Sequence, residues 1–77
     1  MAYARRDKEA LERLGAKVRE LRLEKGYSQE NLGLDCDLSQ TYISEVEAGK
    51  RNVSALNLRA IARSLGVPAA SLLEDFD

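Results

Sequence analysis

The sequence lacks several residue types on which enzymes and secreted proteins rely. It contains no histidine and no tryptophan, and it has a single cysteine, Cys36, and a single proline, Pro68. The lack of histidine removes the commonest general base and the commonest metal ligand. One cysteine cannot form a disulfide within the chain. These absences argue against an enzyme or a disulfide-stabilised extracellular domain, and we expect no cofactor, metal or small-molecule ligand.

Long apolar runs are also missing. No stretch approaches the roughly 20 apolar residues that cross a bilayer, and residues 1–7 lack the apolar core of a signal peptide. We therefore expect a cytoplasmic protein without a membrane partner. The length of 77 residues predicts a single domain spanning residues 1–77. A domain this small buries a limited core, and dimerisation often adds stability.

Charge is unevenly distributed although the net charge is only −1. Residues 1–27 hold eight basic and five acidic residues, and residues 49–66 hold four basic residues and no acidic one. Between them, residues 28–48 hold five acidic residues and no basic one, and residues 67–77 hold three acidic residues. A surface that binds phosphate would therefore have to come from the two basic blocks.

The chain is predicted to be all-α, because its β-branched residues never alternate over a run. Gly26, Gly49 and Gly66 each stand where a helix needs a left-handed end. Five helices are expected: residues 7–25, three that begin at the capping residues Ser28, Ser39 and Ser54, and residues 68–75. The apolar residues expected to face the core recur at helical spacing. They are Leu11, Leu14, Val18, Leu21, Leu32, Cys36, Ile43, Val46, Leu58, Ile61, Ala62 and Leu65.

The second and third helices form a candidate helix-turn-helix over residues 28–49. This motif joins two short helices by a tight turn. It needs a capped second helix whose first turn projects outward, and Ser39 is a good cap. It also needs a turn residue that tolerates positive φ, and Asp37 visits that region more readily than most residues.

These segments resemble one protein family. EKGYSQ (24–29), TYISEVEAGKRN (41–52) and ARSLGV (62–67) together follow the pattern of the phage repressor and Cro-like (XRE-type) helix-turn-helix regulators. The resemblance covers roughly residues 14–74 and implies a compact five-helix domain of the lambda-repressor-like type. TYIS followed by KRN is also similar to the controller proteins of restriction-modification systems. The implied function is a transcriptional regulator that binds double-stranded DNA in a sequence-specific manner.

The resemblance implies a role for residues at matching positions. Expected contacts to base edges come from the recognition helix: Gln40, Thr41, Tyr42 and Glu45. Expected phosphate contacts are Gln29, Ser39, Lys50, Arg51 and Asn52, with a groove as an alternative for Arg51. Arg22 and Glu47 stand where the family often has a partly buried ion pair. Glu45 is the doubtful base contact, because phosphates repel a carboxylate that does not meet cytosine.

The sequence departs from the family pattern at three positions. Gly33 stands where alanine is usual, which costs about 1 kcal/mol of helix propensity. Asp37 replaces the usual glycine in the turn, and Asn31 replaces the usual glutamate, which weakens the capping box with Ser28. We expect these differences to reduce the stability of the motif without changing the fold.

A palindromic operator read by a homodimer is the favoured mode of binding, since one motif reads only a few base pairs. The C-terminal region is unusually apolar and is the expected dimer interface. Its large apolar residues are Leu65, Val67, Leu72, Leu73 and Phe76. Their alternative role is to close the core of the monomer.

Other readings stay open at this point. The chain could instead bind a protein, as an antitoxin does, or be the DNA-binding part of a longer repressor. Arg5 and Arg6 are read as a tail rather than as an arm that reaches DNA. Cys36 is read as a small core residue rather than as a redox switch.

Overall fold

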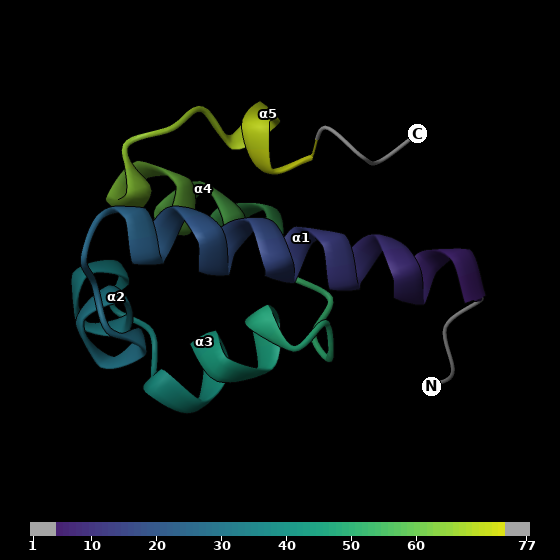
Figure 1. The fold of residues 1–77 in the computed structure, drawn as a ribbon, viewed down its shortest axis with the longest axis horizontal. Coiled ribbons are helices and arrows are strands. Elements are labelled where there is room, and N and C mark those ends of the chain that lie inside the picture. The colour runs from purple at the N-terminus through teal and green to yellow at the C-terminus, as the bar shows by residue number, and fades with distance from the viewer. Residues whose placement is uncertain (1–4, 74–77) are drawn as a thin grey trace.

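Five helices and no strand make up the part of the chain that the computed structural model describes, residues 5–73. They are α1 (Arg5–Glu24), α2 (Gln29–Cys36), α3 (Gln40–Glu47), α4 (Ala55–Leu65) and α5 (Ala69–Leu72). The long α1 runs through the middle, with α2 and α3 along one side and α4 and α5 on the other (Figure 1). None of these helices is long and apolar enough to cross a membrane.

The predicted caps are present at the starts of α2, α3 and α4. The side-chain oxygens of Ser28, Ser39 and Ser54 each accept the backbone N–H three residues further on, at 3.0, 3.0 and 3.2 Å. The three predicted glycine ends adopt φ of 79°, 75° and 74°. These six helix boundaries are thus set by residues whose local chemistry starts or ends a helix.

Two helix boundaries differ from prediction by two or more residues. Helix α1 begins at Arg5 rather than at residue 7, so Arg5 and Arg6 belong to its first turn and not to a tail. Helix α5 ends at Leu72 rather than at residue 75. Leu73 leaves helical geometry, and its N–H donates to the carbonyl of Ala70 in a tighter turn, which lets Leu73 pack on the core beside Leu72. Residues 74 and 75 of the predicted helix lie outside the described residues.

The core lies where α1 meets the other four helices. The predicted apolar residues are buried in it, apart from Leu21 and Cys36, which are half-buried and pack against its edge. Leu32, Ile43, Ile61, Val18 and Val46 are the largest fully buried side chains. Burying one such side chain stabilises the fold by about 1.5–3 kcal/mol. The inward residues of the motif thus hold α2 to α4 and α3 to α1.

Polar contacts add to this packing at the end of α1. The ammonium of Lys25 donates to the carbonyl of Ser64 at 2.6 Å, and the hydroxyl of Ser64 donates to the carboxylate of Asp35. These contacts tie the end of α1 and the exposed side of α2 to the last turn of α4.

Candidate nucleic-acid interface

The turn between α2 and α3 has the predicted helix-turn-helix geometry. Asp37 lies at φ 62° and ψ 40°, and its N–H is directed to the carbonyls of Gly33 and Leu34. The N–H of Leu38 donates to the carbonyl of Gly33 at 2.8 Å. A Cβ on Gly33 would lie 2.6 Å from the carbonyl oxygen of Leu38. Gly33 therefore allows the chain to turn back closely on α2, and the expectation that it only weakens the helix was incomplete.

The start of α2 is capped by two hydrogen bonds between Ser28 and Asn31. Asn31 cannot complete the usual capping box, but its side-chain oxygen accepts the hydroxyl of Ser28 at 2.7 Å. The same hydroxyl oxygen accepts the N–H of Asn31 at 3.0 Å. The two residues thus form a reciprocal pair, so the loss expected from replacing glutamate is reduced.

Helix α3 buries one face and exposes the other. Ile43 and Val46 are 0% and 1% exposed, while Gln40 and Thr41 are exposed in the first turn. Because Ser39 caps this turn, the exposed polar side chains start at a rigid helix end. Such a helix end can be placed against base edges in a groove.

The structure joins three of the predicted DNA contacts into a cluster that also includes one residue not predicted. Arg51 donates through Nε to a carboxylate oxygen of Glu45 at 2.9 Å, and its guanidinium lies 5.1 Å from the ring centre of Tyr42. The hydroxyl of Tyr42 accepts a hydrogen bond from the side-chain amide of Asn57 at 3.1 Å. Asn57 comes from the first turn of α4, and spacing along the chain does not predict its contact with α3.

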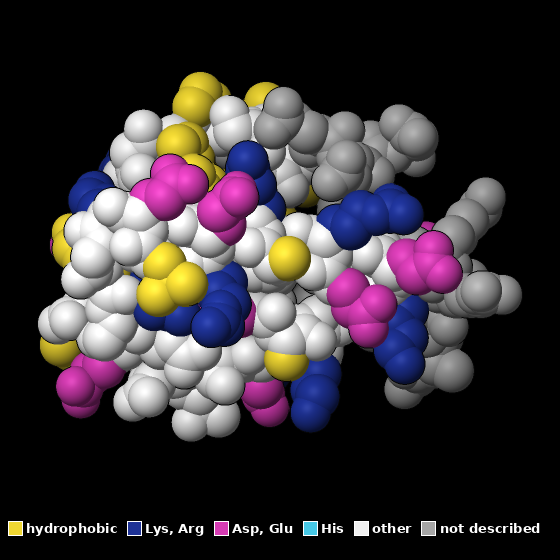
Figure 2. Space-filling model, viewed as in Figure 1, with side chains coloured by type: hydrophobic (Ala, Val, Ile, Leu, Met, Phe, Trp, Pro, Cys, Tyr) yellow, Lys and Arg dark blue, Asp and Glu magenta, His cyan; other side chains and the backbone are white. Residues whose placement is uncertain are grey.

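Three of the predicted phosphate contacts, Lys50, Arg51 and Asn52, lie in the segment between α3 and α4. Lys50 and Asn52 are exposed there, beside Arg51. On the face that Figure 2 shows, acidic and basic side chains alternate along α1 and form no patch of a single sign. That face of α1 therefore presents no positive patch, and this segment stays the predicted source of phosphate contacts.

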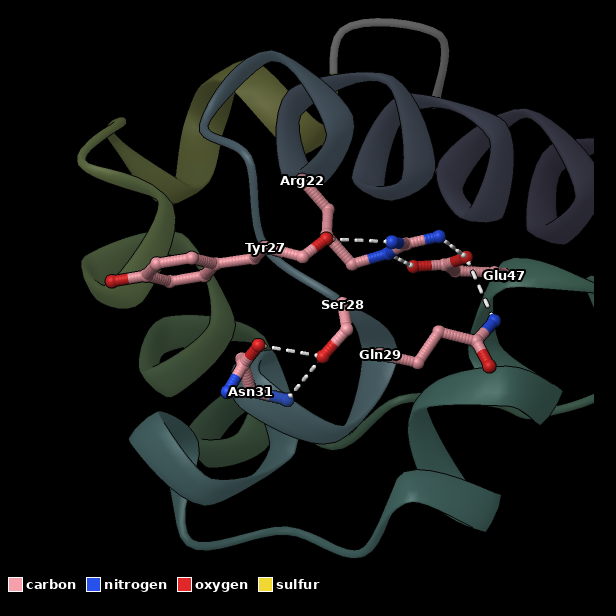
Figure 3. A network of polar contacts seen from close by, with 6 residues as sticks. All are labelled: Arg22, Tyr27, Ser28, Gln29, Asn31 and Glu47. Atoms are coloured by element: carbon pink, nitrogen blue, oxygen red, sulfur yellow. Dashed lines mark hydrogen bonds and ion pairs between the residues drawn. The ribbon is translucent and has the colours of Figure 1, made fainter.

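Arg22 and Glu47 form the ion pair that the family resemblance implies (Figure 3). Nε and Nη2 of Arg22 donate to the two carboxylate oxygens at 2.7 and 3.0 Å, and Nη1 donates to the carbonyl of Tyr27 at 2.8 Å. The two side chains are 8% and 4% exposed. The hydrogen bond to Glu47 raises the pKa of Arg22 above its ordinary value, so the guanidinium stays charged. The pair fixes α3 to α1.

Gln29, a predicted phosphate contact, has a partner within the protein. Its side-chain nitrogen donates to Glu47 at 3.1 Å, so the amide points to the ion pair (Figure 3). Glu47 is acceptor-only and has lone pairs left after binding Arg22, which explains the attraction. The side-chain nitrogen expected on phosphate is thus engaged within the protein.

The predicted dimer residues are only partly available. Leu65 and Leu72 are 7% and 3% exposed, so they belong to the core of the monomer and their assignment to the dimer interface was wrong. Leu72 is buried because the short α5 must bury its apolar side to dock on α1 and α4, and Leu65 belongs to the buried face of α4 itself. Val67 and Leu73 are half-buried, and Phe76 lies outside the described residues.

The half-buried Cys36 has no metal ligands around it. The described residues contain no group of three or more potential metal-binding side chains. The thiol donates to the carbonyl of Ala60 at 3.6 Å, and burial raises its pKa above the ordinary value. Cys36 therefore acts in this structure as a packed thiol at the α2–α4 contact.

Comparison with known proteins agrees with this geometry. The family model described as helix-turn-helix matches residues 18–72. The control protein C.BamHI of Bacillus amyloliquefaciens is 51% identical over 61 residues, which are 78% of this chain and 75% of that protein.

Solved structures show the same arrangement. The restriction-modification controller protein C.AhdI from Aeromonas hydrophila superposes with a TM-score of 0.79 at 40% identity, covering 80% of this chain and 94% of that one. The biofilm master regulator SinR, solved in complex with DNA, superposes with a TM-score of 0.75 at 30% identity, covering 78% and 97%. The chain therefore belongs to the helix-turn-helix family and is homologous to restriction-modification controller proteins.

Proposed function

We propose that this chain is a transcriptional regulator that binds a palindromic DNA operator as a homodimer, with α3 as the recognition helix. The observation that carries this proposal is the rigid, capped first turn of α3, which exposes Gln40 and Thr41 while the opposite face is buried. The complex of the homologous SinR with DNA supports it. The protein would then act on DNA in the bacterial cytoplasm.

The side chains of the first turn suit base reading. The amide of Gln40 can donate to and accept from adenine, and the methyl group of Thr41 can contact the methyl of thymine. Ser39, Lys50 and Asn52 would hold the phosphates that flank these bases. Two copies related by a twofold axis would place recognition helices about 34 Å apart along the duplex.

Selection from a randomised DNA pool tests base reading directly. We expect the wild-type protein to select an inverted repeat. Gln40→Ala or Thr41→Ala should lose about 1–3 kcal/mol on that site and relax discrimination at one or two bases. If both variants select the wild-type sequence with unchanged discrimination, α3 is not the recognition helix.

Lys50→Ala is the contrasting variant, because a phosphate contact carries charge but no sequence information. It should weaken binding to all sequences about equally and lower the slope of log affinity against log salt by about one unit. A wild-type slope in this variant would exclude Lys50 from the phosphate contacts.

A further inference from the structure

Arg51 is held from two sides before any DNA is bound. Its Nε is 2.9 Å from a carboxylate oxygen of Glu45, and its guanidinium lies over the ring of Tyr42. The ring is itself held, because its hydroxyl accepts from Asn57 and its body packs on the core. Three elements, α3, the following loop and the start of α4, thus converge on one guanidinium.

We propose that Arg51 reads a guanine base through its two terminal nitrogens and that Glu45 is a positioning residue for Arg51 rather than a base contact. This inference rests on the proposed function. For Arg51 it favours the groove, which the family resemblance left as the alternative to phosphate, and it replaces the doubtful base contact of Glu45 with a positioning role.

The edge of the guanidinium that remains available suits guanine. Nε donates to Glu45, and the terminal nitrogens make no hydrogen bond within residues 5–73. The guanidinium is a flat fork, so the two terminal nitrogens point the same way in one plane. Guanine presents O6 and N7 as two adjacent acceptors in the major groove, and a bidentate arginine is their commonest partner.

Charge argues against a simple phosphate role. The carboxylate of Glu45 offsets the positive charge of Arg51, so the pair attracts phosphate much less than Lys50 does. What the carboxylate supplies is orientation, because it fixes one edge of the fork. The same contact engages one of the two carboxylate oxygens of Glu45 and turns that side chain toward Arg51. An arginine so oriented reads bases better than it anchors a backbone.

Arg51→Lys separates the two roles of this residue. Lysine keeps the charge but loses the planar fork. We expect selection from a randomised pool to show at least a tenfold loss of preference for guanine at one position of each half-site, with an unchanged salt slope. Arg63→Lys, the same exchange in the last turn of α4, is the control and should select the wild-type sequence.

A second pair of variants tests Glu45. If Glu45 acts through Arg51, Glu45→Ala reduces the preference for that guanine in the wild-type background and causes no further reduction in the Arg51→Lys background. A further loss in the double variant would mean that Glu45 reads the base pair itself, which would overturn its positioning role. Thermal unfolding of each variant shows that the fold is kept, since both side chains are partly exposed.

The outcomes separate this inference from the proposed function. If the wild-type protein selects no sequence, the proposed function fails. If the wild-type protein selects an operator and Arg51→Lys selects it with undiminished preference, Arg51 only meets phosphate, and this inference fails while the proposed function stands.

Discussion

At the scale of single residues, two Arg–Glu pairs of the same chemistry differ in burial and in role. Arg22 and Glu47 are almost fully buried, and the carboxylate accepts three hydrogen bonds, two from Arg22 and one from Gln29. Arg51 and Glu45 are 51% and 39% exposed. Water screens the second pair, so its effect on stability is small. The buried pair holds α3 in place, whereas the exposed pair orients a side chain.

Removing one carboxylate from each pair should reveal this difference. Glu47→Ala leaves a buried guanidinium with only the carbonyl of Tyr27, so we expect a loss of about 3–5 kcal/mol in the free energy of unfolding. Glu45→Ala should change it by no more than about 1 kcal/mol. Urea denaturation of the two variants measures both values, and equal losses would show that burial does not govern these pairs.

Cys36 provides a prediction about pH and reactivity. Burial is the main cause that raises its pKa in the folded protein above the ordinary value of 9.0, so the folded state favours the neutral thiol. As pH rises past 9.0 the unfolded chain loses this proton first, and the stability that the thiol contributes falls as pH rises through the folded pKa. Below pH 9.0 this contribution is complete.

Two measurements check this expectation. Iodoacetamide should alkylate Cys36 more slowly than it alkylates free cysteine at pH 8, because less thiolate is present. Cys36→Ala should lose less stability between pH 9 and pH 10 than the wild-type protein does, since the remaining titrating groups are shared. Alkylation as fast as that of free cysteine would instead favour the alternative of a redox switch.

At the scale of helices, the crossing of α1 and α3 depends on a missing side chain. A Cβ on Gly15 would collide with the carbonyl oxygen of Val46 and would lie 2.6 Å from that of Glu47. A Cβ on Gly49 would lie 2.6 Å from Cγ of Glu12. Backbone therefore touches backbone at this crossing, and the close approach brings Glu47 within reach of Arg22.

Gly15→Ala should destabilise the protein although alanine is the better helix former. The gain in helix propensity is about 1 kcal/mol, while overpacking against a backbone costs about 1–3 kcal/mol and forces α1 away from α3. Gly26→Ala is the matched control, because no atom lies within 4 Å of its Cβ and only its φ of 79° is strained. We expect Gly26→Ala to lower the free energy of unfolding by about 1–2 kcal/mol.

Thermal unfolding should show a loss of stability for either variant, so DNA binding is the readout that distinguishes the two glycines. Gly15→Ala displaces the recognition helix, so it should weaken DNA binding, whereas Gly26→Ala at the end of α1 should leave it intact. A Gly15→Ala protein as stable as the wild type, with full affinity, would mean that α1 and α3 separate without cost.

At the scale of the whole molecule, the surface on which a second copy would pack is expected in the C-terminal region. Leu65 and Leu72 close the core, which leaves Val67 and Leu73 at its edge. The proposed homodimer needs an apolar contact between its two copies. Leu73 packs at the edge of the core, so a charge there would disturb such a contact with less change to the core than a charge at Leu65 or Leu72.

Leu73→Asp should therefore shift the protein toward the monomer. Sedimentation equilibrium at micromolar concentration measures the mass, and we expect a fall toward half the wild-type value where the wild type is a dimer. Leu34→Asp is the control, because Leu34 is 75% exposed on α2 and a charge there should leave the mass unchanged. If Leu73→Asp stays folded with the wild-type mass at every concentration, another surface forms the dimer.

The sequence by itself determined the helices, their order and the identity of the motif. Caps, glycine ends and apolar spacing act between residues a few positions apart, so Ser39, Gly49 and the stripe of α1 could be read without knowing how the chain folds. The family pattern added the buried pair of Arg22 and Glu47.

Only the tertiary structure decided which side chains meet across helices. Two such contacts are the hydrogen bond from Gln29 to Glu47 and that from Asn57 to Tyr42. The lack of room for a Cβ at Gly15 and Gly33 likewise depends on how closely two elements approach. The same is true of the different burial of Leu72 and Leu73. The docking of the four-residue α5 buries Leu72 in the core and leaves Leu73 half-buried. Spacing along a chain specifies the face of a helix, but the distance to its neighbour is set by every side chain packed between them.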